Sequence, residues 1–128
     1  MMLRVLITFA SFFAFDKKLV AQNNIEGLWK GSSICQVKES PCHDEQVVYH
    51  ILQDSNKLFQ VTMNKIINGK EDYVGTLPFH LDSLTGAFIS RDQERNTLWE
   101  FKISKNEMSG KLFYRNQLYR LIEIKKED

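Results

Sequence analysis

The stretch Trp99-Glu-Phe-Lys-Ile103 alternates large apolar side chains with charged ones, residue by residue. Successive side chains of a β-strand point to opposite faces, so this pattern predicts a strand with one face in a core and the other in water. Residues 108–114 alternate in the same way. Only a short turn at Lys105-Asn106 separates the two stretches, which predicts an antiparallel pair.

The same two-residue period recurs on both sides of this pair. It predicts eight strands, at residues 26–34, 46–53, 58–66, 73–79, 87–91, 99–103, 108–114 and 117–125. Most connections are short and rich in Asn, Asp, Gly and Ser, and such loops exclude the long crossover that a parallel pair needs. We therefore predict an all-β fold, an eight-stranded antiparallel up-and-down β-barrel, with two packed sheets as the alternative.

The beginning of the chain predicts export. Arg4 is followed by an uninterrupted apolar run at residues 5–15, the length of a signal-peptide core. This run is too short to cross a bilayer, which takes about 20 residues. Leu19-Val20-Ala21 offers the small or apolar residues of a cleavage site. We expect residues 1–21 to be a signal peptide and residues 22–128 to be one barrel domain, secreted or periplasmic. An uncleaved signal acting as an anchor is the alternative.

Charge argues against two classes of partner. The chain has 128 residues, the length of one domain, and a formal charge of +1. Residues 1–21 carry three cations and one anion, so their removal changes the formal charge to −1. A nearly neutral domain lacks the basic surface that nucleic acids and anionic lipids attract. We expect no nucleic-acid partner and no stable membrane insertion after signal cleavage.

Two cysteines, Cys35 and Cys42, flank a turn at Ser40-Pro41. In an exported chain an even number of cysteines favours pairing, so we predict a disulfide between them. The rival interpretation is a metal site built from Cys35, Cys42, His43, Asp44, Glu45 and His50. Their spacing matches no zinc pattern, and an oxidising compartment would consume the thiols. We expect no metal and no cofactor.

A Gly-x-Trp pattern at Gly27-Leu28-Trp29 opens the first predicted strand, and Arg120 lies on the last one. Together with an eight-stranded meander, these residues resemble the lipocalin-like (calycin-type) superfamily and small exported bacterial barrels. The resemblance implies that Trp29 plugs the closed end of the barrel. It also implies that Arg120 packs over Trp29, as a cation stacked on an indole face.

Large aromatic side chains gather on the face that we expect to point inward: Trp29, Phe59, Tyr73, Phe79, Trp99, Phe101 and Tyr114. A small barrel is filled by its own side chains, and only a wider one leaves room for a ligand. The rings are therefore either a packed core or the lining of a pocket. The pocket interpretation assigns ligand binding to Phe59, Tyr73, Phe79, Trp99, Phe101 and Tyr114.

Two functions fit this architecture. In the first, the barrel holds a small apolar ligand at its open mouth. In the second, the barrel is solid and the disulfide-stapled loop 36–45 engages a protein, as in small exported protease inhibitors, because a rigid loop loses little entropy on binding. We find no nucleophile elbow and no phosphate loop, so we expect no enzyme. Catalysis would need His43, His50 and His80 to converge in one cleft.

Overall fold

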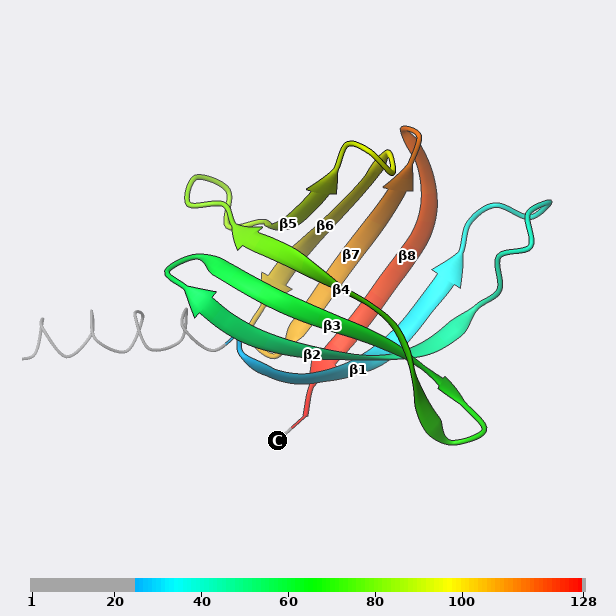
Figure 1. Ribbon diagram of the computed structural model, residues 1–128, viewed down its shortest axis with the longest axis horizontal. Coiled ribbons are helices and arrows are strands. Elements are labelled where there is room, and N and C mark those ends of the chain that lie inside the picture. Colours follow the sequence, from blue (N-terminus) through cyan, green and yellow to red (C-terminus); the bar gives the residue numbers. More distant parts are fainter. Residues whose placement is uncertain (1–24, 128) are drawn as a thin grey trace, which may run out of the picture.

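The computed structural model describes residues 25–127, and the predicted signal peptide lies outside them. The described residues form eight strands and no helix (Figure 1). The strands are β1 (Gly27–Cys35), β2 (Glu45–Ser55), β3 (Leu58–Ile67), β4 (Lys70–Leu81), β5 (Phe88–Asp92), β6 (Thr97–Ser104), β7 (Glu107–Tyr114) and β8 (Gln117–Lys126). Their ends differ from the predicted ends by a few residues at most, because the alternation marks each strand locally.

Each strand pairs antiparallel with the next, and β1 pairs with β8, so the sheet closes into a barrel. The β3–β4 turn has positive φ at Asn68 and Gly69, and the β7–β8 turn at Arg115 and Asn116. Two consecutive positive φ angles define the tight hairpin turn whose twist matches that of the strands. The predicted up-and-down barrel is confirmed, and the alternative of two packed sheets is excluded.

The two ends of the barrel differ. The disulfide end carries the loop 36–44 between β1 and β2, and the tryptophan end is the opposite one, where β1 begins. Closure is weakest between β4 and β5, which pair only at His80 with Ile89 and at Leu81 with Phe88. Beyond these two pairs β4 runs apart from β5 toward the disulfide end (Figure 1).

An extra residue in β4 reverses one predicted orientation. Met63 on β3 stands opposite Gly75, but the next residue, Asn64, stands opposite Tyr73, so Val74 has no partner. One inserted residue shifts the inward–outward alternation of a strand by one position. Tyr73, which we expected to face inward, therefore points out of the barrel and is 65% exposed. The prediction of its orientation is wrong.

A second irregularity lies in β8. Leu112 on β7 stands opposite Arg120, whereas the next residue, Phe113, stands opposite Leu118, so Tyr119 is the extra residue. Arg120 therefore shares the inward face of β8 with the core residues that follow it, while Leu118 changes face. Tyr114 ends β7, and because the wall stops there its side chain stays 40% exposed.

Candidate functional site

Four phenylalanine rings fill the half of the barrel near the tryptophan end. Phe59, Phe79, Phe88 and Phe101 are 1–4% exposed. The ring of Phe79 stacks on that of Phe88 with centroids 4.7 Å apart, Phe59 meets Phe88 edge-on at 5.3 Å, and Phe101 lies 6.0 Å from Phe79. Three of the predicted ligand-binding residues, Phe59, Phe79 and Phe101, thus contact one another as a packed core.

Trp29 lies fully buried near the start of β1. Its indole N–H donates a hydrogen bond to the Ile25 carbonyl at 2.9 Å, which satisfies the only polar group of the side chain. The residue opposite Trp29 on β8 is Lys126, and Arg120 stands opposite Cys35. Cys35 lies six positions along the strand from Trp29, a distance of about 20 Å. The prediction that Arg120 packs over Trp29 is therefore wrong.

The interior is less filled toward the disulfide end. Gly75 faces inward opposite Met63, and a Cβ atom built on Gly75 would have no heavy atom within 4 Å. Trp99 packs against the core from an inward position on β6 but is only half-buried. Trp99 and Tyr114 are the predicted ligand-binding residues that occupy inward positions and stay partly accessible.

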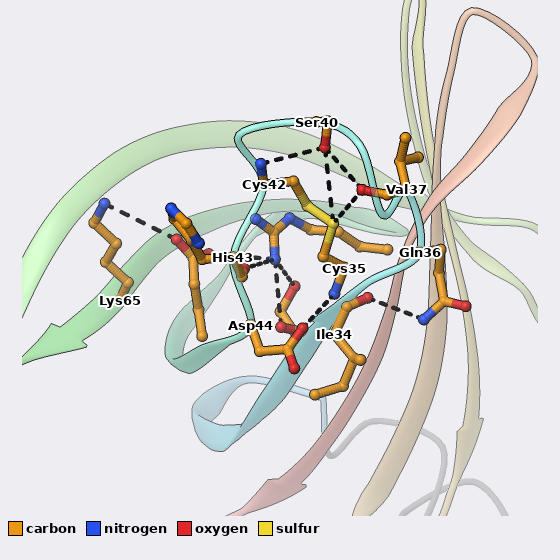
Figure 2. Close-up of polar contacts among 12 residues, drawn as sticks. Ile34, Cys35, Gln36, Val37, Ser40, Cys42, His43, Asp44 and Lys65 are labelled. Atoms are coloured by element: carbon orange, nitrogen blue, oxygen red, sulfur yellow. Dashed lines mark hydrogen bonds and ion pairs between the residues drawn. A yellow bond between two sulfur atoms is a disulfide. The ribbon is translucent and has the colours of Figure 1, made fainter.

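A disulfide closes the loop 36–44. Cys35 and Cys42 are bonded, with their Cα atoms 5.9 Å apart, which confirms the predicted pairing (Figure 2). Because both sulfurs are consumed in this bond, neither is a thiolate ligand for the metal site considered as the rival interpretation. Within the loop, the Ser40 hydroxyl donates to the Val37 carbonyl at 3.0 Å and accepts the Cys42 backbone N–H at 3.2 Å.

Side chains fix the loop to the barrel at its base. The Asp44 carboxylate accepts the Cys35 backbone N–H at 2.8 Å (Figure 2). From β8, the Arg120 guanidinium donates to the His43 carbonyl at 2.9 Å. It also donates to the Ser33 carbonyl at 3.3 Å and to the Ser33 hydroxyl at 3.1 Å. Arg120 therefore connects β8 with the end of β1 and with the loop. The resemblance had implied a different role, in which Arg120 packs over Trp29 at the closed end of the barrel.

Four inward polar side chains from adjacent strands surround this contact. We call them the polar rim: Ser33 on β1, Glu45 on β2, Lys65 on β3 and Arg120 on β8. The Glu45 carboxylate lies 3.6 Å from Arg120 Nη1 and 3.9 Å from Lys65 Nζ. Two cations face one anion, so the rim carries a formal charge of +1. These three charged side chains belong to strands of the barrel wall and not to the loop.

Tyr49 connects the rim to the core. Its ring meets that of Phe101 edge-on, with centroids 6.3 Å apart. Burial raises the pKa of the Tyr49 hydroxyl well above its usual range, while the positive charge of Arg120 opposes the rise. Tyr49 was not among the predicted site residues, and neither was Ser33. No local pattern marks them, because their roles depend on strand pairing across the barrel.

The histidines lie in separate places. His50, on the outer wall, has its Nε2 atom 2.7 Å from Glu71 Oε1, which also accepts from the Asn64 amide at 2.9 Å. These contacts, that of Asn64 first, lower the pKa of Glu71. His43 belongs to the loop at the disulfide end, and His80 pairs with Leu58 at the tryptophan end. The convergence that catalysis would need is not found for these three residues.

Among the described residues, three surface pockets lie on the outer face of the barrel wall. One of about 450 Å³ is lined by Arg91, Leu98, Phe113 and Arg115 among others, and two more of about 320 and 550 Å³ lie beside Lys30 and beside Lys102. None of the three is lined by a predicted ligand-binding residue.

Within residues 25–127, no cluster of three or more His, Cys, Asp or Glu side chains is placed to hold a metal ion. The same residues include no helix long and apolar enough to span a bilayer.

The fold and the site define the chain as a small, closed antiparallel β-barrel with a disulfide-braced loop and a polar rim at one end. Comparison with protein-family models, with curated proteins and with solved structures found no significant match.

Proposed function

We propose that this protein is an exported binding module that captures a protein partner with the loop 36–44. The observation that carries the proposal is the bracing of this loop. One disulfide, the Asp44 contact and the Arg120 contact hold it on a closed barrel. A loop that is already ordered loses little conformational entropy on binding, so more of its contact energy becomes affinity.

The composition of the loop suits a protein surface. Its exposed side chains include Lys38, Glu39, Pro41 and His43. They present a positive and a negative charge, a rigid proline ring and an imidazole that can form hydrogen bonds. The opposite half of the barrel is filled by the phenylalanine core and offers no comparable site among its inward residues. A phenylalanine core in one half of the barrel and an exposed, braced loop at the other end together favour binding through the loop.

The lipocalin-like resemblance supports this proposal only at the level of architecture. The closed eight-stranded meander and the buried Trp29 agree with it. The position of Arg120, at the disulfide end, departs from it. We therefore infer no ligand from the resemblance.

Site-specific photo-cross-linking tests the proposal. A photoreactive amino acid is placed at Glu39 in the loop, and a matched control carries it at Leu84, which is 93% exposed on the loop at the tryptophan end. Both variants are exposed to the extracellular or periplasmic fraction of the host. We expect one discrete adduct from position 39 and none of the same mass from position 84.

A competition experiment then distinguishes a specific partner from non-specific cross-linking. Unlabelled wild-type protein should abolish the adduct, whereas a variant with Pro41, His43 and Asp44 replaced by Gly, Ala and Asn should compete poorly while keeping the barrel fold by circular dichroism. Equal competition by the two proteins, or equal adducts from both positions, would overturn the proposal.

Export is tested by sequencing the N-terminus of the protein recovered from the host. We expect it to begin at Gln22. A chain that retains Met1 and stays in the cytoplasm would contradict export, whatever the loop binds.

A second candidate function is the retention of a small apolar ligand near the disulfide end. The space beside Gly75 and the partial exposure of Trp99 favour it. Native mass spectrometry of protein from its own host should then show an adduct, and Gly75→Leu, which fills the space, should remove it. An adduct-free spectrum of the wild-type protein would contradict this candidate.

A further inference from the structure

Arg120 is mostly buried, with 12% of its side chain exposed, yet it uses only part of its hydrogen-bonding capacity. Each of its contacts with Ser33, His43 and Glu45 is made by one nitrogen, Nη1. A guanidinium has five N–H donors in a rigid plane. Its Nε and Nη2 atoms donate to no acceptor within residues 25–127.

These two nitrogens keep contact with solvent. Across the described residues, Asn64 Oδ1 is the only side-chain nitrogen or oxygen that is fully buried without a partner. Nε and Nη2 of Arg120 are therefore not fully buried, although only 12% of the side chain is exposed. Together they form the edge of the guanidinium that binds a carboxylate through two parallel hydrogen bonds.

The surroundings hold this edge in place. Nη1 is anchored by the carbonyls of Ser33 and His43, and the guanidinium carbon lies 5.8 Å from the centroid of the Tyr119 ring. Both the position and the plane of the group are thus set before any ligand arrives. A preorganised fork in a partly desolvated site binds an anion more strongly than a mobile surface arginine does.

The charge of the rim allows an anion to enter. Glu45 offsets only one of the two cations, and it lies on the Nη1 side of Arg120, at 3.6 Å. Lys65 adds the second cation from β3. An incoming carboxylate would bring the formal charge of the polar rim from +1 to zero.

We propose that the Nε–Nη2 edge of Arg120 is a carboxylate-binding site at the disulfide end of the barrel. The carboxylate comes either from a small free acid or from an acidic side chain of a bound protein, and both present the same two oxygens to the fork. The proposal does not depend on capture by the loop, because it concerns a group on the barrel wall.

Nuclear magnetic resonance tests the site directly in the full, ¹⁵N-labelled chain. The Arg120 Nε–Hε signal, identified by its loss in Arg120→Lys, is followed during titration with sodium acetate at constant ionic strength. We expect a saturating downfield shift that acetamide does not produce. The exposed Arg91 serves as the internal control and should saturate only at higher acetate concentration. No shift at Arg120, or the same shift with acetamide, would overturn the proposal.

Matched variants test the fork. Arg120→Lys keeps the charge and a donor for Ser33 but loses the two-nitrogen edge, so acetate affinity should fall about tenfold. Arg91→Lys should leave it unchanged. An Arg120→Lys protein that is folded and binds acetate like the wild type would contradict the site. If this variant fails to fold, the titration of the wild-type protein with acetate and acetamide still tests whether Arg120 binds a carboxylate.

The source of the carboxylate is distinguished with two further probes. Benzoate adds an apolar ring to the carboxylate, and N-acetyl-aspartate methylamide presents it as a protein side chain would. Tighter binding of benzoate than of acetate indicates a small free acid. Tighter binding of the aspartate derivative indicates an acidic side chain. If neither binds at Arg120, the proposal fails, while the cross-linking result at position 39 continues to test the proposed function separately.

Discussion

Gly110 and Phe101 stand opposite each other on β7 and β6, and the Phe101 ring occupies the space that a Cβ atom at position 110 would need. Gly110 is buried, and its φ angle is not positive. The glycine is therefore required by side-chain packing and not by backbone conformation. This contact shows how closely the phenylalanine core is packed at the level where a ligand was expected.

Gly110→Ala should destabilise the barrel by about 1 to 3 kcal/mol, because the added methyl group must displace the Phe101 ring. Urea unfolding followed by tryptophan fluorescence measures the change. Gly75→Ala is the matched control, since its methyl group enters open space and should cost no stability. Equal stability of the two variants would show that the core is not filled around Phe101.

Replacing Cys35 and Cys42 together by serine should lower the free energy of unfolding by about 2 to 3 kcal/mol, because the short loop is no longer closed in the unfolded chain. The barrel itself should persist, because the phenylalanine core fills the half of the barrel away from the loop. Denaturant unfolding of the oxidised wild type and the variant gives the difference. A variant as stable as the wild type would mean that the disulfide serves only the shape of the loop.

Tyr49 should make stability fall in alkaline solution. Its pKa is raised in the folded state by burial, so above pH of about 10 the unfolded chain releases a proton that the folded chain retains. The contribution is complete below that pH and is lost as the pH rises further. The free energy of unfolding, measured against pH, should decline less steeply in Tyr49→Phe.

Glu71 should titrate below its ordinary range, because the Asn64 amide and then His50 stabilise its charged form. A lowered pKa in the folded state stabilises the fold above the ordinary pKa of the group, and this contribution is lost as the pH falls through the lowered value. In a carboxyl ¹³C titration, Asn64→Ala should move the Glu71 pKa upward. The Asp82 pKa, lowered by the Thr85 hydroxyl, should not move. A Glu71 pKa unaffected by Asn64→Ala would assign its shift to His50 alone.

Features that depend on neighbouring residues were predictable. The alternation at 99–103 identifies a strand without knowledge of its partners, and Asn68-Gly69 identifies its turn in the same way. The pairing of Cys35 with Cys42 spans a separation of only 7 positions. In each case the interacting groups lie close together in the chain, so the local pattern contains the information.

Which rings line the interior was only partly predictable. Phe59, Phe79 and Phe101 lie inward as the alternation indicates, but they pack on one another, and the alternation cannot tell a filled interior from an empty one. Tyr73 points outward because one unpaired residue, Val74, reverses the alternation. A bulge of this kind leaves no mark in a pattern of apolar and polar residues.

Eight strands, their order and the disulfide were predictable from the chain alone, because they follow from periodicity, turn residues and short separations. The position of Arg120 at the disulfide end, where it contacts Ser33 across a separation of 87 positions, follows only from the folded barrel. The physical reason is the register of closure between β1 and β8. That register depends on the stagger of the strands summed around the whole barrel, so it cannot be inferred from the sequence of any single strand.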